Sequence, residues 1–368
     1  QRLDVVGVTG TNGKTTVVHV LATLARAAGR STRTIGTLTG ERTTPEAPEL
    51  QRLLAEAVGA GVDLVAMEVS SHALDLHRVD GVAFRAAAFT NLGRDHLDHH
   101  GTLEAYFAAK ARLFEPERCA VAVIDVDDPH GARLAAAVEV PVVATGLSTV
   151  EVLEVGPRGS RVRWRGHTLA VPLPGRFNLV DVVVAAELAV AVGIDDALVA
   201  DAVTTLEPVP GRFERVDDGD GPTVLVDYAH TPDGLEAALT AARDLTERDL
   251  VVVVGAGGDR DREKRPRMGE VARALADRVV VTSDNPRSED PAVIAAAVVS
   301  GMTRPPDLVE LDRRLAIRHA LAHARPGDVV VIAGKGHETT QIFADTAVDF
   351  DDRVVARAEL ARLRERVR

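Results

Sequence analysis

One segment near the start of the chain limits what it can fold into more than any other. An apolar run predicts a strand over residues 3–9, and a helical pattern covers residues 17–22. Between them the chain reads Gly10-Thr11-Asn12-Gly13-Lys14-Thr15-Thr16. A glycine loop that joins a strand to a helix binds phosphates through backbone N–H groups at the helix N-terminus. The strict P-loop pattern has a glycine at the position of Val8, so the segment predicts a variant phosphate-binding loop.

Strand and helix patterns alternate through the first half of the chain. Strands are expected over residues 32–38, 63–69, 85–90, 119–126 and 140–145, and helices over residues 48–60, 102–114 and 128–137. This alternation is typical of a parallel sheet covered by helices. Residues 148–172 instead show short alternating runs around three glycines, which predict a small antiparallel meander. Two helices are expected next, over residues 177–192 and 195–206.

The alternation resumes after a candidate linker, Glu207-Pro208-Val209-Pro210-Gly211. Strands are expected over residues 223–227, 250–255, 277–283 and 328–333, and a last helix over residues 353–368. We therefore expect an α/β protein with two domains. The first, residues 1–208, is a parallel-sheet P-loop ATPase domain that includes the meander. The second, residues 209–368, is a Rossmann-like α/β domain.

The composition excludes several classes of partner and site. The chain has 55 acidic and 43 basic residues, a net charge of −12, which argues against a nucleic-acid or anionic membrane surface. Cys119 is the single cysteine, so an internal disulfide and a cysteine-based zinc site are excluded. No apolar run approaches the roughly 20 residues of a membrane helix, and no signal peptide is recognisable. We expect a cytoplasmic monomer.

Lysine is scarce in this chain. Of the 43 basic residues only four are lysines, Lys14, Lys110, Lys264 and Lys335. A GC-rich genome explains the bias towards arginine. It also draws attention to each remaining lysine, because a primary amine can perform chemistry that a guanidinium cannot.

Polar side chains stand at the ends of two predicted strands. Glu68 ends the strand over residues 63–69, and Asp95 and His96 follow the strand over residues 85–90. Functional groups of a parallel sheet gather beyond the carboxyl ends of its strands. We therefore expect these side chains near the phosphate loop.

Several segments together resemble the Mur ligases, the ATP-dependent amide-forming enzymes of peptidoglycan precursor synthesis, and most closely the MurE type. In the first half these are the phosphate loop, Thr43-Thr44-Pro45-Glu46, Glu68-Val69-Ser70-Ser71-His72-Ala73-Leu74, Thr90-Asn91-Leu92-Gly93-Arg94-Asp95-His96-Leu97-Asp98 and Tyr106-Phe107-Ala108-Ala109-Lys110. In the second half they are Asp227-Tyr228-Ala229-His230-Thr231-Pro232-Asp233, Gly257-Gly258-Asp259-Arg260-Asp261, Asp284-Asn285-Pro286-Arg287 and Gly334-Lys335-Gly336-His337-Glu338. They occur in the family's order and cover nearly the whole chain.

The resemblance implies a reaction and a set of residues for the first domain. Such a ligase phosphorylates a substrate carboxylate with ATP, and an amine then displaces phosphate from the acyl phosphate. By this match Lys14 contacts the β- and γ-phosphates, and Thr15, Glu68 and His96 hold Mg²⁺, which prefers oxygen ligands. The family carbamylates the lysine that matches Lys110, which turns the amine into a carboxylate-like metal ligand. We expect the protein mainly to position the reactants and neutralise charge.

The resemblance assigns the rest of the ATP site and the incoming amino acid largely to the second half. Nucleotide contacts are expected from Asn178, Arg212, Asp227 and His230. The family usually has a second asparagine where this chain has Asp181, which leaves the base contact open. Asp284-Asn285-Pro286-Arg287 is the family's signature for meso-diaminopimelate. Arg287 offers a bidentate fork to the additional carboxylate and Glu338 can accept the ammonium group, with Arg260, Asn285 and Gly334 completing the pocket.

The resemblance leaves two possibilities for the acceptor. Thr43, Thr44, Ser70 and Arg78 match acceptor-side positions, which favours a peptide that ends in a D-Glu-like carboxylate. A complete MurE-type enzyme has about 100 further residues before the phosphate loop, a typical domain size, which bind the uridine nucleotide of the acceptor. Only the first few residues of the chain precede the first predicted strand here. We therefore expect either a removed domain or a shortened ligase whose acceptor lacks UDP.

Four alternatives remain open on the sequence. A shortened ligase could build a natural-product peptide or a cyanophycin-like polymer. A folylpolyglutamate synthetase would share the ATP motifs, although the second-half motifs at Asp284 and Gly334 argue against it. A subunit of the MurT kind, which works with a glutaminase partner, generally has four zinc-binding cysteines. A nucleotide-binding module without turnover would not need Lys14, Glu68, His96 and Lys110 together.

Overall fold

Strand β1 (Asp4–Thr9) lies inside a six-stranded parallel sheet. The order is β2-β3-β1-β4-β5-β6, and every neighbouring pair is parallel. The other strands are β2 (Thr32–Ile35), β3 (Leu64–Glu68), β4 (Ala86–Phe89), β5 (Ala122–Asp125) and β6 (Val142–Thr145). The three central strands are buried, because helices cover both faces of the sheet. Their carboxyl ends carry the phosphate loop, Glu68 and residues 90–96.

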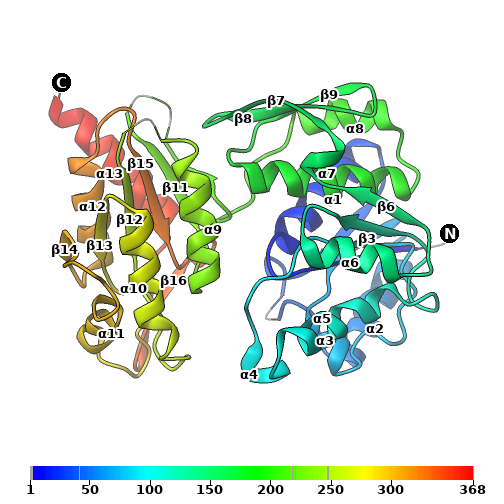
Figure 1. Cartoon of the computed structure of the whole chain (residues 1–368), viewed down its shortest axis with the longest axis horizontal. Coiled ribbons are helices and arrows are strands. Elements are labelled where there is room, and N and C mark those ends of the chain that lie inside the picture. Colours follow the sequence, from blue (N-terminus) through cyan, green and yellow to red (C-terminus); the bar gives the residue numbers. More distant parts are fainter. Residues whose placement is uncertain (1–2, 41, 218, 220, 247, 368) are drawn as a thin grey trace. The chain divides into compact units, whose positions relative to one another are not determined.

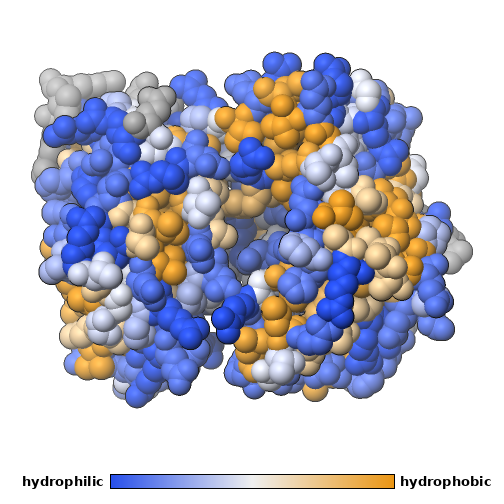
Figure 2. Space-filling model, viewed as in Figure 1, coloured by the Kyte–Doolittle hydropathy of each residue, from blue (hydrophilic) through white to orange (hydrophobic). Residues whose placement is uncertain are grey.

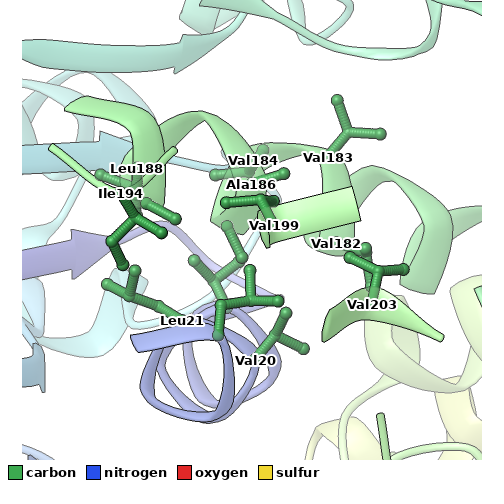
Figure 3. Close-up of a cluster of buried hydrophobic side chains, with 14 of the residues drawn as sticks. Val20, Leu21, Val182, Val183, Val184, Ala186, Leu188, Ile194, Val199 and Val203 are labelled. Atoms are coloured by element: carbon green, nitrogen blue, oxygen red, sulfur yellow. The ribbon is translucent and has the colours of Figure 1, made fainter. Parts of the chain in front are cut away.

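The helices of this part are α1 (Lys14–Ala27), α2 (Ala47–Gly59), α3 (Ser71–Asp75), α4 (Leu97–His100), α5 (Leu103–Ala111), α6 (Pro129–Ala137), α7 (Arg176–Ala191) and α8 (Asp196–Val203). Helix α7 is apolar on almost every side, since it packs against α1, α8 and the sheet. Figure 3 shows Val20 and Leu21 of α1 directed towards the apolar side chains of α7 and α8. This cluster fixes the helix that begins directly after the phosphate loop.

Strands β7 (Glu151–Gly156), β8 (Gly159–Trp164) and β9 (His167–Val171) form the antiparallel meander that the glycine spacing predicts. Its inward side chains, among them Trp164, complete the apolar cluster of α1 and α7. Trp164 Nε1 donates a hydrogen bond of 2.7 Å to Glu187 Oε1 on α7, which satisfies the buried indole. In Figure 2 hydrophobic residues gather on the visible face over this meander, where Leu153 is exposed.

The second half contains its own sheet, in the order β10-β11-β15-β12-β13-β14. Its strands are β10 (Glu214–Arg215), β11 (Thr223–Asp227), β12 (Leu250–Val254), β13 (Arg278–Val281), β14 (Leu308–Val309) and β15 (Val329–Ala333), and only β10 is antiparallel to its neighbour. The helices are α9 (Pro232–Arg243), α10 (Lys264–Leu275), α11 (Pro291–Val299), α12 (Arg313–His323) and α13 (Asp352–Val367), and a hairpin joins β16 (Thr340–Phe343) to β17 (Thr346–Asp349). The two α/β arrangements confirm the predicted fold class.

The chain divides into two compact units, residues 1–207 and residues 208–368 (Figure 1). The computed structural model describes residues 3–40, 42–217, 219, 221–246 and 248–367. Within these ranges no helix is both long and apolar enough to cross a bilayer.

Candidate functional site

The phosphate loop folds as a compact turn between β1 and α1. Gly13 precedes the first turn of α1 with φ of 85°, a conformation that favours glycine. Lys14 Nζ donates hydrogen bonds of 2.8 Å to the carbonyl oxygens of both Gly10 and Thr11. Thr90 Oγ1 donates to Asn12 O at 2.6 Å, which ties the loop to the end of β4. The loop therefore presents the N-terminus of α1, whose dipole favours an anion.

Helix α7 supplies two buried polar side chains to this part of the unit. A Cβ on Gly13 would lie 3.1 Å from Cγ of Asp181, so the loop needs glycine where it passes over this carboxylate. Asn178 Nδ2 donates to Pro174 O at 2.8 Å. Asn178 Oδ1 is buried and has no hydrogen-bond partner among the described residues. A buried acceptor of this kind fits a contact with a bound donor such as a nucleobase amine.

Glu68 stands at the carboxyl end of β3 and is almost completely buried. Its Oε1 accepts hydrogen bonds from Thr15 Oγ1 at 3.1 Å and from the Thr37 backbone N–H at 2.8 Å. Thr37 Oγ1 donates to Oε2 at 3.2 Å. The Thr15 and Glu68 oxygens have the spacing of two adjacent ligands of one octahedral Mg²⁺, so they fit a shared magnesium ion.

Gly36 leaves space for the Glu68 carboxylate, and an alanine variant tests whether that space is required. A Cβ on Gly36 would lie 2.8 Å from Glu68 Cγ and 2.9 Å from its Cδ. Gly36→Ala is therefore expected to push the carboxylate away from Thr15, to cost about 1–3 kcal/mol of stability and to raise the Mg²⁺ concentration that supports half-maximal activity. Gly40→Ala is the matched control, because its nearest neighbour would lie 3.5 Å away. Equal Mg²⁺ titration curves for the two variants would contradict this role of Gly36.

Lys110 on α5 is fully buried, and its Nζ donates to Gly10 O at 2.7 Å. Nζ also lies 4.5 Å from the centre of the Tyr106 ring. Among the described residues this amine has no ion pair with a carboxylate. Burial, together with the charge of Lys14, holds the pKa of Lys110 well below its usual range. A lowered pKa favours the neutral amine, which is the form that reacts with CO₂, so Lys110 fits carbamylation.

His96 lies in the segment between β4 and α4, with a left-handed φ of 54°. Its ring centre is 6.0 Å from that of Tyr106, and Tyr106 Oη lies 3.2 Å from Thr11 Oγ1. Partial desolvation is the largest cause that lowers the pKa of His96 to about 4, helped by nearby cations such as Lys14 and opposed by Asp95. The neutral imidazole at pH 7 can accept a proton or bind a metal.

The predicted acceptor-side residues adjoin Glu68. Thr44 Oγ1 donates to the backbone oxygen of Glu68 at 2.9 Å and accepts from Ser70 N at 3.0 Å. Thr43 Oγ1 lies 3.2 Å from Thr37 Oγ1. Arg78 Nη1 donates to Thr44 O at 3.3 Å, whereas Arg78 Nε is buried without a hydrogen-bond partner among the described residues. Arg78 Nη2 pairs with Glu46 Oε1 at 2.9 Å, so the guanidinium is held beside Thr44.

In the second unit the loops after β12, β13 and β15 meet. Arg287 has φ of 52°, and its Nη1 donates to Gly258 O at 2.7 Å. Asn285 Nδ2 donates to Glu338 Oε2 at 2.7 Å. A Cβ on Gly334 would lie 2.6 Å from Asp284 Oδ2, so glycine is required where these loops cross. Arg260, in the loop after β12, is exposed.

Lys335, to which the sequence motifs assign no role, connects this group. It is completely buried, and its Nζ donates to Asn285 Oδ1 at 3.0 Å, Glu338 Oε2 at 3.1 Å and Thr340 O at 2.6 Å. The scarcity of lysine in this chain was the one sequence feature that could have marked Lys335 as functional. Tyr106 was noted only as part of the motif that ends at Lys110, without a role of its own. Thr37 was missed, because an isolated threonine has no recognisable sequence pattern.

The predicted nucleotide residues of this unit lie around Tyr228. Asp227 accepts from the backbone N–H groups of Phe213 at 2.7 Å and Ala229 at 2.8 Å. The Arg212 guanidinium stacks over the Tyr228 ring at 4.6 Å, and the His230 ring lies 4.6 Å from the same ring. Arg212, Asp227 and His230 thus adjoin one another, as Asp284, Asn285 and Glu338 do.

Comparisons with known proteins identify the family of this chain. The chain matches the Mur ligase middle domain over residues 8–189 and the Mur ligase, glutamate ligase domain over residues 211–336. It is 48% identical to the UDP-N-acetylmuramoyl-L-alanyl-D-glutamate--2,6-diaminopimelate ligase of Synechococcus elongatus, over 98% of this chain and 77% of that protein. It is 45% identical to the ligase of the same name from Geobacillus thermodenitrificans, over 97% of this chain and 78% of that protein.

Solved structures give the same result. A structure of a UDP-N-acetylmuramoyl-L-alanyl-D-glutamate--2,6-diaminopimelate ligase superimposes with a TM-score of 0.70 at 36% identity, over 99% of this chain and 79% of that one. The folylpolyglutamate synthase of Mycobacterium tuberculosis, solved with ADP and AMPPCP, shares the fold at 22% identity with a TM-score of 0.68, over 90% of this chain and 88% of that one. Domain matches, sequence identity and fold coincide, and the chain belongs to the Mur ligase family.

Proposed function

We propose that this protein is an ATP-dependent, ADP-forming ligase that joins meso-diaminopimelate to the D-Glu carboxylate of UDP-N-acetylmuramoyl-L-alanyl-D-glutamate in peptidoglycan precursor synthesis. The observation that carries the proposal is the buried group of Thr15, Glu68 and Lys110 around the phosphate loop. The identity of 45–48% to ligases of this name supports the substrates.

In the proposed reaction an oxygen of the acceptor carboxylate attacks the γ-phosphorus of ATP, and ADP leaves. The amine of diaminopimelate then attacks the carbonyl carbon of the acyl phosphate, loses a proton and expels phosphate. Lys14 and the N-terminus of α1 stabilise the transferred phosphoryl group. Thr15, Glu68, His96 and carbamylated Lys110 would hold Mg²⁺, which would supply positive charge to neutralise the phosphates. Thr43, Thr44, Ser70 and Arg78 orient the acceptor.

The two units have different proposed roles. We assign residues 1–208 as the central ATP-binding domain and residues 209–368 as the C-terminal domain that binds the amino acid. In the first unit we assign nucleotide contacts to Asn178 and to the loop residues Gly10, Thr11, Asn12, Gly13 and Thr16. In the second unit we assign nucleotide contacts to Arg212, Asp227 and His230. Because the reaction consumes ATP and a nucleotide-linked precursor, we expect it in the cytoplasm. A monomeric state remains a prediction.

Charge complementarity with diaminopimelate supports the proposed pocket for the incoming amino acid. The far end of diaminopimelate carries an ammonium and a carboxylate, and Arg287 and Glu338 offer the complementary charges, with Arg260, Asp284, Asn285 and Gly334 around them. Lys335 holds Asn285 and Glu338 in place through three hydrogen bonds. We infer that Lys335 is a positioning residue for this pocket.

Arg287→Lys tests the specificity. Lysine retains the charge but loses the bidentate fork, so kcat/KM for diaminopimelate is expected to fall about 10- to 100-fold, a loss of about 1.4–2.8 kcal/mol. Release of phosphate in the presence of both substrates measures the effect. Arg262→Lys is the control, since this exposed arginine contributes only a surface ion pair to Glu289. Unchanged selectivity between diaminopimelate and lysine in Arg287→Lys would remove the argument for this pocket.

A further inference from the structure

Four imidazole rings collect beside the phosphate loop, on the segments of α3 and α4. The His72 ring lies 4.6 Å from that of His96, 4.3 Å from that of His99 and 5.5 Å from that of His100. The proposed reaction uses His96 alone. A single ion pair would explain the position of His99, but it does not explain why His72 and His100 converge on the same point.

A carboxylate completes this group. His99 Nε2 lies 2.8 Å from Asp75 Oδ2 at the end of α3. One ligand atom from each of Asp75, His99 and His100 lies within 4.8 Å of the other two, and this set is the one such group of His, Cys, Asp and Glu found among the described residues. His100 Nε2 lies 2.9 Å from Ser71 Oγ, and the His100 ring stacks on Tyr106 at 5.1 Å. Small side-chain rotations would bring the three ligand atoms around one ion.

The chemistry of these ligands selects a class of metal. Two imidazole nitrogens and one carboxylate, with an open fourth position for water, form a typical tetrahedral zinc site. Imidazole suits Zn²⁺ and Co²⁺, whereas Mg²⁺ prefers oxygen ligands.

We propose that Asp75, His99 and His100 form a second metal site that binds a Zn²⁺-like divalent ion, separate from the Mg²⁺ ligands Thr15, Glu68, His96 and Lys110. An ion at this site joins the last residue of α3 to the two last residues of α4. It thereby fixes the position of α4, which begins directly after His96.

Titration of the nucleotide-free protein with Co²⁺ in excess Mg²⁺ tests the site. We expect one equivalent of Co²⁺ to bind with the intense visible absorption of a four-coordinate ion, and Zn²⁺ to displace it. His99→Phe and Asp75→Asn should each weaken this binding at least tenfold. Both residues are exposed, so both variants should fold, and each should retain Mg²⁺-supported ligation.

Two further variants separate this site from other metal ligands. Glu68→Gln should leave the Co²⁺ spectrum unchanged, because Glu68 belongs to the nucleotide-linked metal. His323→Ala should also leave it unchanged, although His319 and His323 lie 4.2 Å apart on α12. Absence of a four-coordinate Co²⁺ spectrum, equal binding in His99→Phe, or loss of the spectrum in Glu68→Gln would each overturn the proposal. These readouts do not depend on ligase activity, so they stand apart from a failure of the proposed function.

Discussion

Lys110→Met is expected to reduce the rate of amide formation about 100- to 1,000-fold, the size of effect seen when one preorganised electrostatic group is removed from an active site. Methionine keeps most of the length of the lysine stem but cannot form a carbamate. Gly10 O loses one hydrogen bond yet keeps the one from Lys14. Because the variant also removes the desolvation cost of a buried amine, the midpoint of thermal unfolding should be unchanged or higher. Phosphate release and thermal unfolding measure the two effects.

A pair of lysine-to-arginine variants separates carbamate chemistry from positive charge. Lys110→Arg places a permanent cation at the site but lacks the primary amine, and it should be as impaired as Lys110→Met. Lys264→Arg makes the same change at the start of α10 and should keep the original rate. If Lys110→Arg were active while its fold is preserved, the assignment of Lys110 as a carbamylated ligand would be wrong.

The largest effect on stability is expected at Arg313. Its guanidinium and the carboxylate of Asp352 are both fully buried, and they are joined by two hydrogen bonds of 2.7 Å. Arg313 also donates to Ser283 O at 3.2 Å and Ala333 O at 3.0 Å. Arg313→Met leaves the Asp352 carboxylate buried and unpaired, so it should lower the free energy of unfolding by roughly 3–5 kcal/mol. Denaturant unfolding monitored by circular dichroism measures this loss.

The same arginine connects stability to the amino-acid pocket. Ser283 and Ala333 directly precede the loops of Asp284 and Gly334, so loss of Arg313 should also raise KM for diaminopimelate. In Arg313→Met/Asp352→Leu both charges are removed, and stability should recover, whereas KM should stay high because the two carbonyl contacts are still missing. Arg314→Met is the control, because Arg314 is itself exposed and its 3.8 Å ion pair with Glu359 is longer than the 2.8 Å pair that Arg318 makes with the same carboxylate. This variant should cost less than about 1 kcal/mol. Equal losses in Arg313→Met and Arg314→Met would contradict this account.

The sequence was sufficient for the long elements of the fold. Hydrophobic periodicity and the positions of glycines predicted β11 at its observed bounds and most other strands within a few residues. The helix expected over residues 102–114 instead ends as α5 at Ala111 and continues as a 3₁₀ turn over Arg112–Phe114. Helices α3 and α4 were missed, because five and four residues are too short to show a helical period.

The candidate site was predictable only where residues belong to motifs. Glu68 was expected from its position at a strand end, and its neighbour Thr15 from the phosphate loop. The contacts of Thr37, Tyr106 and Lys335 depend on how separate loops pack, which a pattern along the chain does not contain. The histidines of α3 and α4 lie about 25 residues apart, and only the short turns that begin after Ser70 and His96 bring them together.

Product identification by mass spectrometry tests the central claim most directly. The protein is incubated with ATP, Mg²⁺, bicarbonate and meso-diaminopimelate, together with UDP-N-acetylmuramoyl-L-alanyl-D-glutamate or with the same dipeptide lacking UDP. The account predicts an amide-linked tripeptide from the UDP acceptor, formed with release of ADP and phosphate and absent with Lys110→Met. Formation of product from the UDP-free dipeptide alone, or ATP hydrolysis without any amide product, would contradict it.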